Sequence, residues 1–100
     1  MAAADVVIAH GDRRAVALRW DGTTMRAPVV VAKGMAPAAQ RIGALAAANG
    51  VAVVENRTLA EAVWREVAVG DPIPEAFYRP AARLLAGVRR TGRRGTAWLT

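Results

Sequence analysis

The chain has 100 residues, a formal net charge of +6 and a hydrophobic fraction of 54%, values that suit one domain able to bury its own core. It has no cysteine and a single histidine, which excludes disulfides, thiolate nucleophiles and zinc or iron–sulfur sites built on cysteine. We therefore expect no structural metal and no cofactor.

The positive charge is gathered near the C-terminal end. The last twelve residues contain no acidic side chain and hold four arginines, Arg89, Arg90, Arg93 and Arg94. The rest of the chain carries a net charge of only +2. We expect a folded domain over residues 1–88 and a basic, disordered tail over residues 89–100. No apolar run approaches the roughly 20 residues that span a bilayer, and no leader sequence opens the chain, so the expected compartment is the cytoplasm.

The first third of the chain predicts three strands. Residues 5–9 (DVVIA) are largely apolar and β-branched, and residues 15–20 alternate, with Val16, Leu18 and Trp20 on one face. The polar residues between these strands favour a turn, so the two are expected to form an antiparallel hairpin. Residues 28–32, an unbroken apolar run opened by a proline, are typical of a central strand covered on both faces.

A helix and a further strand follow. Pro37 suits a first helical turn, and Asn49-Gly50 is a typical C-terminal stop. The apolar positions at helical spacing are Ala38, Ile42, Leu45 and Ala46. Residues 51–54 form the next strand, which is expected to make a parallel crossover with the strand at 28–32.

Two more helices complete the predicted fold. Residues 58–61 have the pattern of a capping box that opens one helix, in which Glu61 and Arg65 are expected to pair on the surface. Residues 72–88 form the last helix, where Pro80 either introduces a kink or marks the start of the regular part. The sequence thus predicts an α/β domain, with a mixed four-stranded sheet built from a hairpin and a parallel crossover and flanked by about four helices.

Polar residues stand at the carboxyl ends of the two predicted parallel strands, at Lys33 and at residues 55–57. Ligands of α/β folds bind at such ends, but no glycine-rich phosphate loop accompanies these residues. A solvated loop or an ion pair is therefore favoured. Trp20 and Trp64 are interpreted as core aromatics rather than as a platform for stacking bases.

Four stretches of the chain occur in a recognisable order: AVALRWD, APVVVAKG, RIGALAAANGVAVVENRTLAEAVW and VGDPIPEAFYRPAARLLAGV. Together they resemble the cytoplasmic domain of the FlhB family, the switch proteins of flagellar and injectisome type III export. The resemblance extends over residues 6–88 without large gaps. It implies a cytoplasmic protein, peripheral at the inner-membrane export apparatus, whose partners are export substrates and the membrane proteins of the export gate.

The predicted hairpin turn departs from that family. Members with the full pattern carry Asn-Pro-Thr-His there: the asparagine amide attacks its own main-chain carbonyl, closes a five-membered ring and expels the proline nitrogen, so the chain cuts itself. The matching positions here are His10, Gly11, Asp12 and Arg13. An imidazole cannot form that ring, and glycine does not supply the strained tertiary amide. We expect no self-cleavage and no catalytic residue, and interpret His10 as a turn residue.

The resemblance also implies a place for binding. The family is thought to receive a short hydrophobic segment of early export substrates in a shallow apolar pocket, whose positions here are Ala27, Pro28, Ala82 and Leu85. The alternative is that these four residues simply pack against one another. Full-length family members place four membrane helices before this domain, whereas this chain enters its first strand within a few residues. We expect a freestanding module, or a domain trimmed from a longer protein.

Two functions remain open at this point. The favoured one is a non-enzymatic module of the export apparatus that binds export substrates or gate components. The alternative is a small basic nucleic-acid-binding protein that acts through its arginine-rich tail, with an affinity that falls steeply with salt. An autoprotease that uses another bond has no support, because no Ser-His-Asp set can be built around His10.

Overall fold

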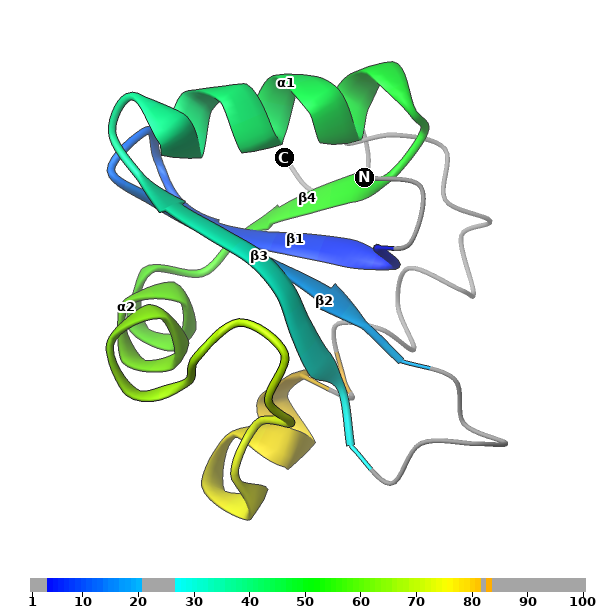
Figure 1. Ribbon diagram of the computed structural model, residues 1–100, viewed down its shortest axis with the longest axis vertical. Coiled ribbons are helices and arrows are strands. Elements are labelled where there is room, and N and C mark those ends of the chain that lie inside the picture. The colour runs from blue at the N-terminus through cyan, green and yellow to red at the C-terminus, as the bar shows by residue number, and fades with distance from the viewer. Residues whose placement is uncertain (1–3, 21–26, 82, 84–100) are drawn as a thin grey trace.

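The structure, a computed structural model, describes residues 4–20, 27–81 and 83. Its strands and helices are β1 (Val6–His10), β2 (Arg14–Arg19), β3 (Val29–Met35), α1 (Ala38–Ala48), β4 (Ala52–Glu55) and α2 (Arg57–Glu66) (Figure 1). Helical backbone recurs over residues 75–81 and at 83. No helix in the described part of the chain is long and apolar enough to cross a membrane.

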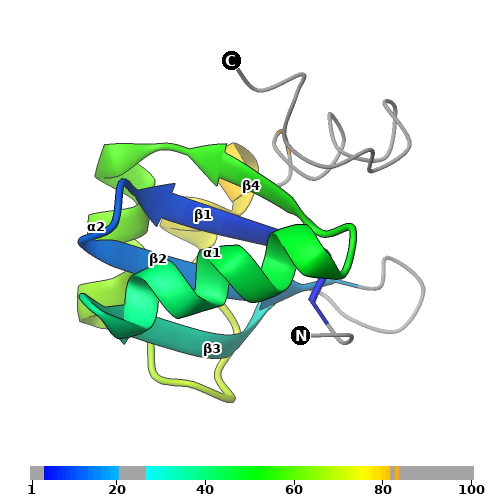
Figure 2. The same cartoon turned by 90° about the horizontal axis from the view of Figure 1, so that it is seen from above.

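The four strands form one mixed sheet in the order β3-β2-β1-β4. β1 pairs antiparallel with β2, β2 pairs antiparallel with β3, and β1 pairs parallel with β4. The predicted mixed sheet with its hairpin is confirmed; the described residues form three helical segments, where about four were expected. α1 connects β3 to a parallel β4, as predicted, but these two strands lie at opposite edges of the sheet (Figure 2).

The prediction of a central strand at residues 28–32 is wrong. β3 lies at an edge, and β1 and β2 occupy the centre. The apolar run has another cause, because the loop before the last helical segment covers the outer edge of β3. Val30 N–H donates to Asp71 O at 3.0 Å, and Gly70 N–H donates to Val30 O at 2.7 Å. The covering loop buries Val30, whereas Val29, Val31 and Ala32 stay partly exposed, unlike most residues of the two central strands.

Helices cover both faces of the sheet, α1 on one side and α2 with residues 75–81 on the other (Figures 1 and 2). The cluster under α1 is made of small residues, among them Val7, Ala15 and Ala46. The cluster on the opposite face is larger and contains Ile8 together with Val16 and Leu18, whose shared face is thus confirmed. β1 is buried by both clusters, because alternate side chains of a strand point to opposite faces.

α1 lies close to β3 because Gly34 has no side chain. A Cβ atom at this position would lie 2.9 Å from the Cβ of Ala38. The close approach brings small residues to the interface: Ala39, which lies outside the predicted helical pattern, is buried, whereas Leu45, one of its apolar positions, is 52% exposed. The helix ends as predicted, with Asn49 at the C-cap.

α2 begins earlier than predicted. Its N-cap is Asn56, whose side-chain oxygen accepts a hydrogen bond from Leu59 N–H at 3.1 Å. The predicted capping box at residues 58–61 is therefore wrong, because an asparagine two residues earlier fills the cap position. Glu61 consequently lies inside the helix, where its carboxylate can contact the β1–β2 turn.

Candidate functional site

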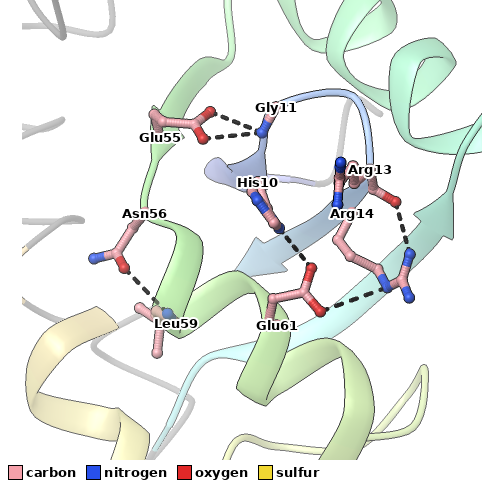
Figure 3. A network of polar contacts seen from close by, with 8 residues as sticks. All are labelled: His10, Gly11, Arg13, Arg14, Glu55, Asn56, Leu59 and Glu61. Atoms are coloured by element: carbon pink, nitrogen blue, oxygen red, sulfur yellow. Dashed lines mark hydrogen bonds and ion pairs between the residues drawn. The ribbon is translucent and has the colours of Figure 1, made fainter.

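The β1–β2 turn, residues 10–13, has a conformation that suits glycine and excludes proline. Gly11 has a φ of 51°, in the left-handed region, whereas the proline ring fixes φ near −65°. The N–H group of Gly11 donates to both carboxylate oxygens of Glu55, at 2.9 and 3.1 Å (Figure 3). Arg13 N–H donates to His10 O at 2.9 Å and closes the turn. The turn is therefore tied to the end of β4 through a backbone donor that proline lacks.

His10 points from this turn toward α2 (Figure 3). Its Nδ1 donates to Oε2 of Glu61 at 2.7 Å, and Nε of Arg14 lies 3.8 Å from the other oxygen. The hydrogen bond from His10 is the main cause that holds the pKa of the Glu61 carboxyl below its usual value; partial burial opposes this shift and the charge of Arg14 supports it. The predicted pair of Glu61 with Arg65 is wrong, because Glu61 turns toward β1 and Arg65 lies 4.0 Å from Glu66 instead.

The polar residues predicted at the strand ends make internal contacts. Nζ of Lys33 donates to Trp64 O and Val67 O, both at 2.9 Å, and so satisfies two carbonyls at the C-terminal end of α2. The Trp64 ring makes two cation–π contacts: the Arg14 guanidinium lies 4.6 Å and the Lys33 ammonium 5.1 Å from its centroid. Trp20 and Trp64 both pack against the larger core cluster, as predicted. These contacts fix α2 against the sheet.

The predicted substrate patch is described only in part, since Ala82, Leu85 and the basic tail at residues 89–100 lie outside the described residues. Pro28 is buried, and its carbonyl accepts a hydrogen bond from Ile73 N–H at 2.9 Å. Ala27 lines a hollow of about 350 Å³, which we call the Ala27 pocket, whose described walls are Ala27, Ile73, Glu75 and Tyr78. Ile73, Glu75 and Tyr78 were not predicted from the sequence, because they come close to Ala27 only through the loop that covers β3.

A second hollow, of about 410 Å³, lies beside the β1–β2 turn, and we call it the turn pocket. It is lined by His10, Arg13, Arg14, Met35, Ala36, Arg57, Glu61 and Arg65. Nothing local in the sequence signals this site, because its residues come from the turn, the end of β3 and two turns of α2. Within the described residues, no three histidine, aspartate or glutamate side chains come together as a metal site would require.

Two solved structures of other proteins share this fold. The cytoplasmic domain of FlhB from Shewanella putrefaciens matches with a TM-score of 0.84 and 31% identity, over 89% of this chain and 73% of that one. A mutated EscU C-terminal domain matches with a TM-score of 0.81 and 25% identity, over 85% of this chain and 84% of that one. The fold therefore defines the class as that of the FlhB and EscU C-terminal domains.

The sequence comparisons identify the family. The chain belongs to the FlhB HrpN YscU SpaS family, whose model matches residues 1–88. The flagellar biosynthetic protein FlhB of Bacillus subtilis (strain 168) is 40% identical over 88 residues, and that of Escherichia coli (strain K12) is 40% identical over 85 residues. These matches cover 88% and 85% of this chain but 24% and 22% of the relatives, so the chain spans about a quarter of their length.

Proposed function

We propose that this protein is a non-enzymatic module of the flagellar or type III export apparatus, which binds export substrates or gate components and does not cut itself. Membership of the FlhB family supports the assignment to protein export. It also supports the proposal that the module is cytoplasmic and associates peripherally with the inner membrane, where it could contact the membrane proteins of an export gate. The main support for the proposal is the β1–β2 turn, in which Gly11 stands at the position of the family's proline.

Two chemical requirements for self-cleavage are absent from this turn. Position 10 offers an imidazole, whose Nδ1 is engaged by Glu61 at 2.7 Å, instead of a side-chain amide that could close a five-membered ring. The nitrogen that would have to leave belongs to Gly11, and its N–H is bonded to the Glu55 carboxylate. β1 and β2 therefore remain one continuous hairpin, and the turn keeps one conformation.

The Ala27 pocket supports binding of a short apolar segment. Ile73 and the Tyr78 ring supply apolar walls, and the small side chain of Ala27 lets another chain approach closely. Tyr78 is positioned by Trp20, with an edge-to-face ring contact and centroids 6.1 Å apart. A volume of about 350 Å³ lies at the lower end of the range for ligand sites, which suits one or two apolar side chains of a bound peptide.

A binding titration tests this surface. The full chain would be titrated with a fluorescently labelled N-terminal peptide of an early flagellar export substrate, beside the variants Ala27→Asp and Leu85→Asp. A carboxylate placed in an apolar contact must be desolvated, so each variant should bind at least tenfold more weakly. Leu45→Asp makes a similar change on the exposed side of α1 and should leave the affinity unchanged.

Thermal melts of each variant would accompany the titration and separate lost binding from lost folding. If Ala27→Asp and Leu85→Asp both bind the peptide as tightly as the unmodified chain, the predicted patch of Ala27, Pro28, Ala82 and Leu85 is not the substrate site. If Leu45→Asp weakens binding equally, the interaction depends on net charge rather than on this pocket.

A further inference from the structure

We propose that the turn pocket binds an acidic peptide segment of a partner protein. The site lies at the end of β3 that holds Met35, whereas the Ala27 pocket lies before the start of the same strand. The two surfaces are therefore separate, and the inference goes beyond substrate binding at the Ala27 pocket.

The turn pocket is rich in positive charge. Four guanidinium groups line the turn pocket, and Glu61 is the one acidic side chain among its described lining residues. The Glu61 carboxylate is already engaged by His10 at 2.7 Å and lies 3.8 Å from Arg14. Among the described residues, no carboxylate lies within ion-pair distance of Arg13 or Arg57. The pocket thus presents positive charge that the described part of the fold does not neutralise.

The position of Arg14 strengthens this argument. Its guanidinium lies on the Trp64 ring, 4.6 Å from the centroid, so the side chain is held in place before any ligand arrives. Its Nε is buried 3.8 Å from Glu61 Oε1, and its Nη1 donates to Arg13 O at 3.0 Å. The Arg14 side chain as a whole is 27% exposed, so part of it remains accessible to a ligand carboxylate. Arginine also suits carboxylates well, because its planar fork can bind both oxygens.

Shape and the apolar wall favour a peptide over other anions. About 410 Å³ exceeds the need of a single phosphate or carboxylate and lies within the usual range for sites that enclose several groups. Met35, which is 47% exposed, and Ala36 form an apolar side wall. A segment with acidic residues on both sides of an apolar one would satisfy the arginines and cover Met35 together.

Nucleic acid fits the same pocket less well. Binding to single-stranded nucleic acid relies on exposed aromatic rings that stack with bases. The Trp64 ring is already in contact with the Arg14 and Lys33 side chains and is not free to stack. An acidic peptide needs no ring to stack on, and it can contact Arg13 and Arg57 at the rim.

Fluorescence anisotropy on the full chain tests the proposal. The probe is a fluorescein-labelled peptide, Asp-Glu-Leu-Glu-Asp, and its control is the amide counterpart, Asn-Gln-Leu-Gln-Asn. We expect the acidic probe to bind and the amide probe to bind at least tenfold more weakly. Arg13→Gln and Arg57→Gln should each weaken binding of the acidic probe at least fivefold. Arg41→Gln removes the same charge from the exposed side of α1 and should change the affinity less than twofold.

Three results would overturn the proposal. Equal binding of both peptides would show that charge recognition is absent. Equal losses in Arg57→Gln and Arg41→Gln, or no loss in either, would show that the probe follows net charge or binds elsewhere. A single-stranded oligonucleotide that binds more tightly than the acidic peptide, and loses affinity in Arg13→Gln and Arg57→Gln, would assign the pocket to nucleic acid instead.

Discussion

Gly11→Pro is expected to lower the free energy of unfolding by about 3 kcal/mol, even though position 11 is exposed and in a turn. The substitution removes the N–H that donates to the Glu55 carboxylate, a charge-assisted bond. Proline also cannot adopt the φ of 51° observed at Gly11, because its ring fixes φ near −65°, so the backbone of the turn would have to change. Because 100-residue domains are commonly stable by only about 5–15 kcal/mol, a urea titration would resolve this loss clearly.

Gly11→Asn is the matched control for this turn. Asparagine keeps the backbone N–H and tolerates the left-handed region, so this variant should lose less than about 1 kcal/mol. If Gly11→Pro proves as stable as Gly11→Asn, the turn accepts the family's proline without cost. The inference that this turn requires the left-handed φ and the N–H group of Gly11 would then be wrong.

Ile8→Ala is expected to cost about 3–4 kcal/mol, because a large side chain is removed from the middle of the core. Ile8 is fully buried in the central strand β1 and belongs to the larger core cluster. Val31, on the edge strand β3, is only partly buried, so Val31→Ala should cost about 1 kcal/mol. Urea unfolding of the two variants measures the difference.

The comparison of Ile8 with Val31 also tests the strand order. A larger loss from Val31→Ala than from Ile8→Ala would place residues 28–32 at the centre of the sheet, against the observed order β3-β2-β1-β4. The ratio of the two losses is informative because both substitutions remove only methyl and methylene groups from an apolar environment.

Local signals in the sequence predicted the elements well, and long-range pairing explains most of the failures. The hairpin, the end of α1 at Asn49 and the α/β class follow from turn residues and periodicity over a few positions. The edge position of β3 could not be predicted from residues 28–32, because the covering loop with Asp71 is about 40 positions away in the chain. Apolar composition reports burial but does not report which neighbour provides it.

Long-range contacts likewise explain why the candidate sites were predicted only in part. The resemblance located the turn at residues 10–13 and Ala27, but not the partners that surround them. Glu55 and Glu61 reach the turn only because α1 connects β3 across the sheet to β4, which pairs with β1, and because α2 follows β4 directly. Glu61 was wrongly assigned to a capping box, since Asn56 competes successfully for the N-cap position. A short window cannot decide such a competition when both residues are good capping residues.

An uncut hairpin, as proposed above, has a structural consequence for binding. His10 and Gly11 hold the turn against Glu61 and Glu55, which belong to α2 and β4. A cut between β1 and β2 would release new chain ends at this point and disturb both contacts. While the hairpin is uncut, the contacts of the turn also hold the shape of the turn pocket, because His10 and Arg13 belong to the turn and line the pocket.

The most direct test of the account is the mass of the purified full chain, measured under denaturing conditions after prolonged incubation at neutral pH. A nucleophile that can close a ring is absent at position 10, so we predict one species with the mass of all 100 residues. Two fragments that arise from a break between residues 10 and 13 would contradict the account, because the protein would then cut its own hairpin.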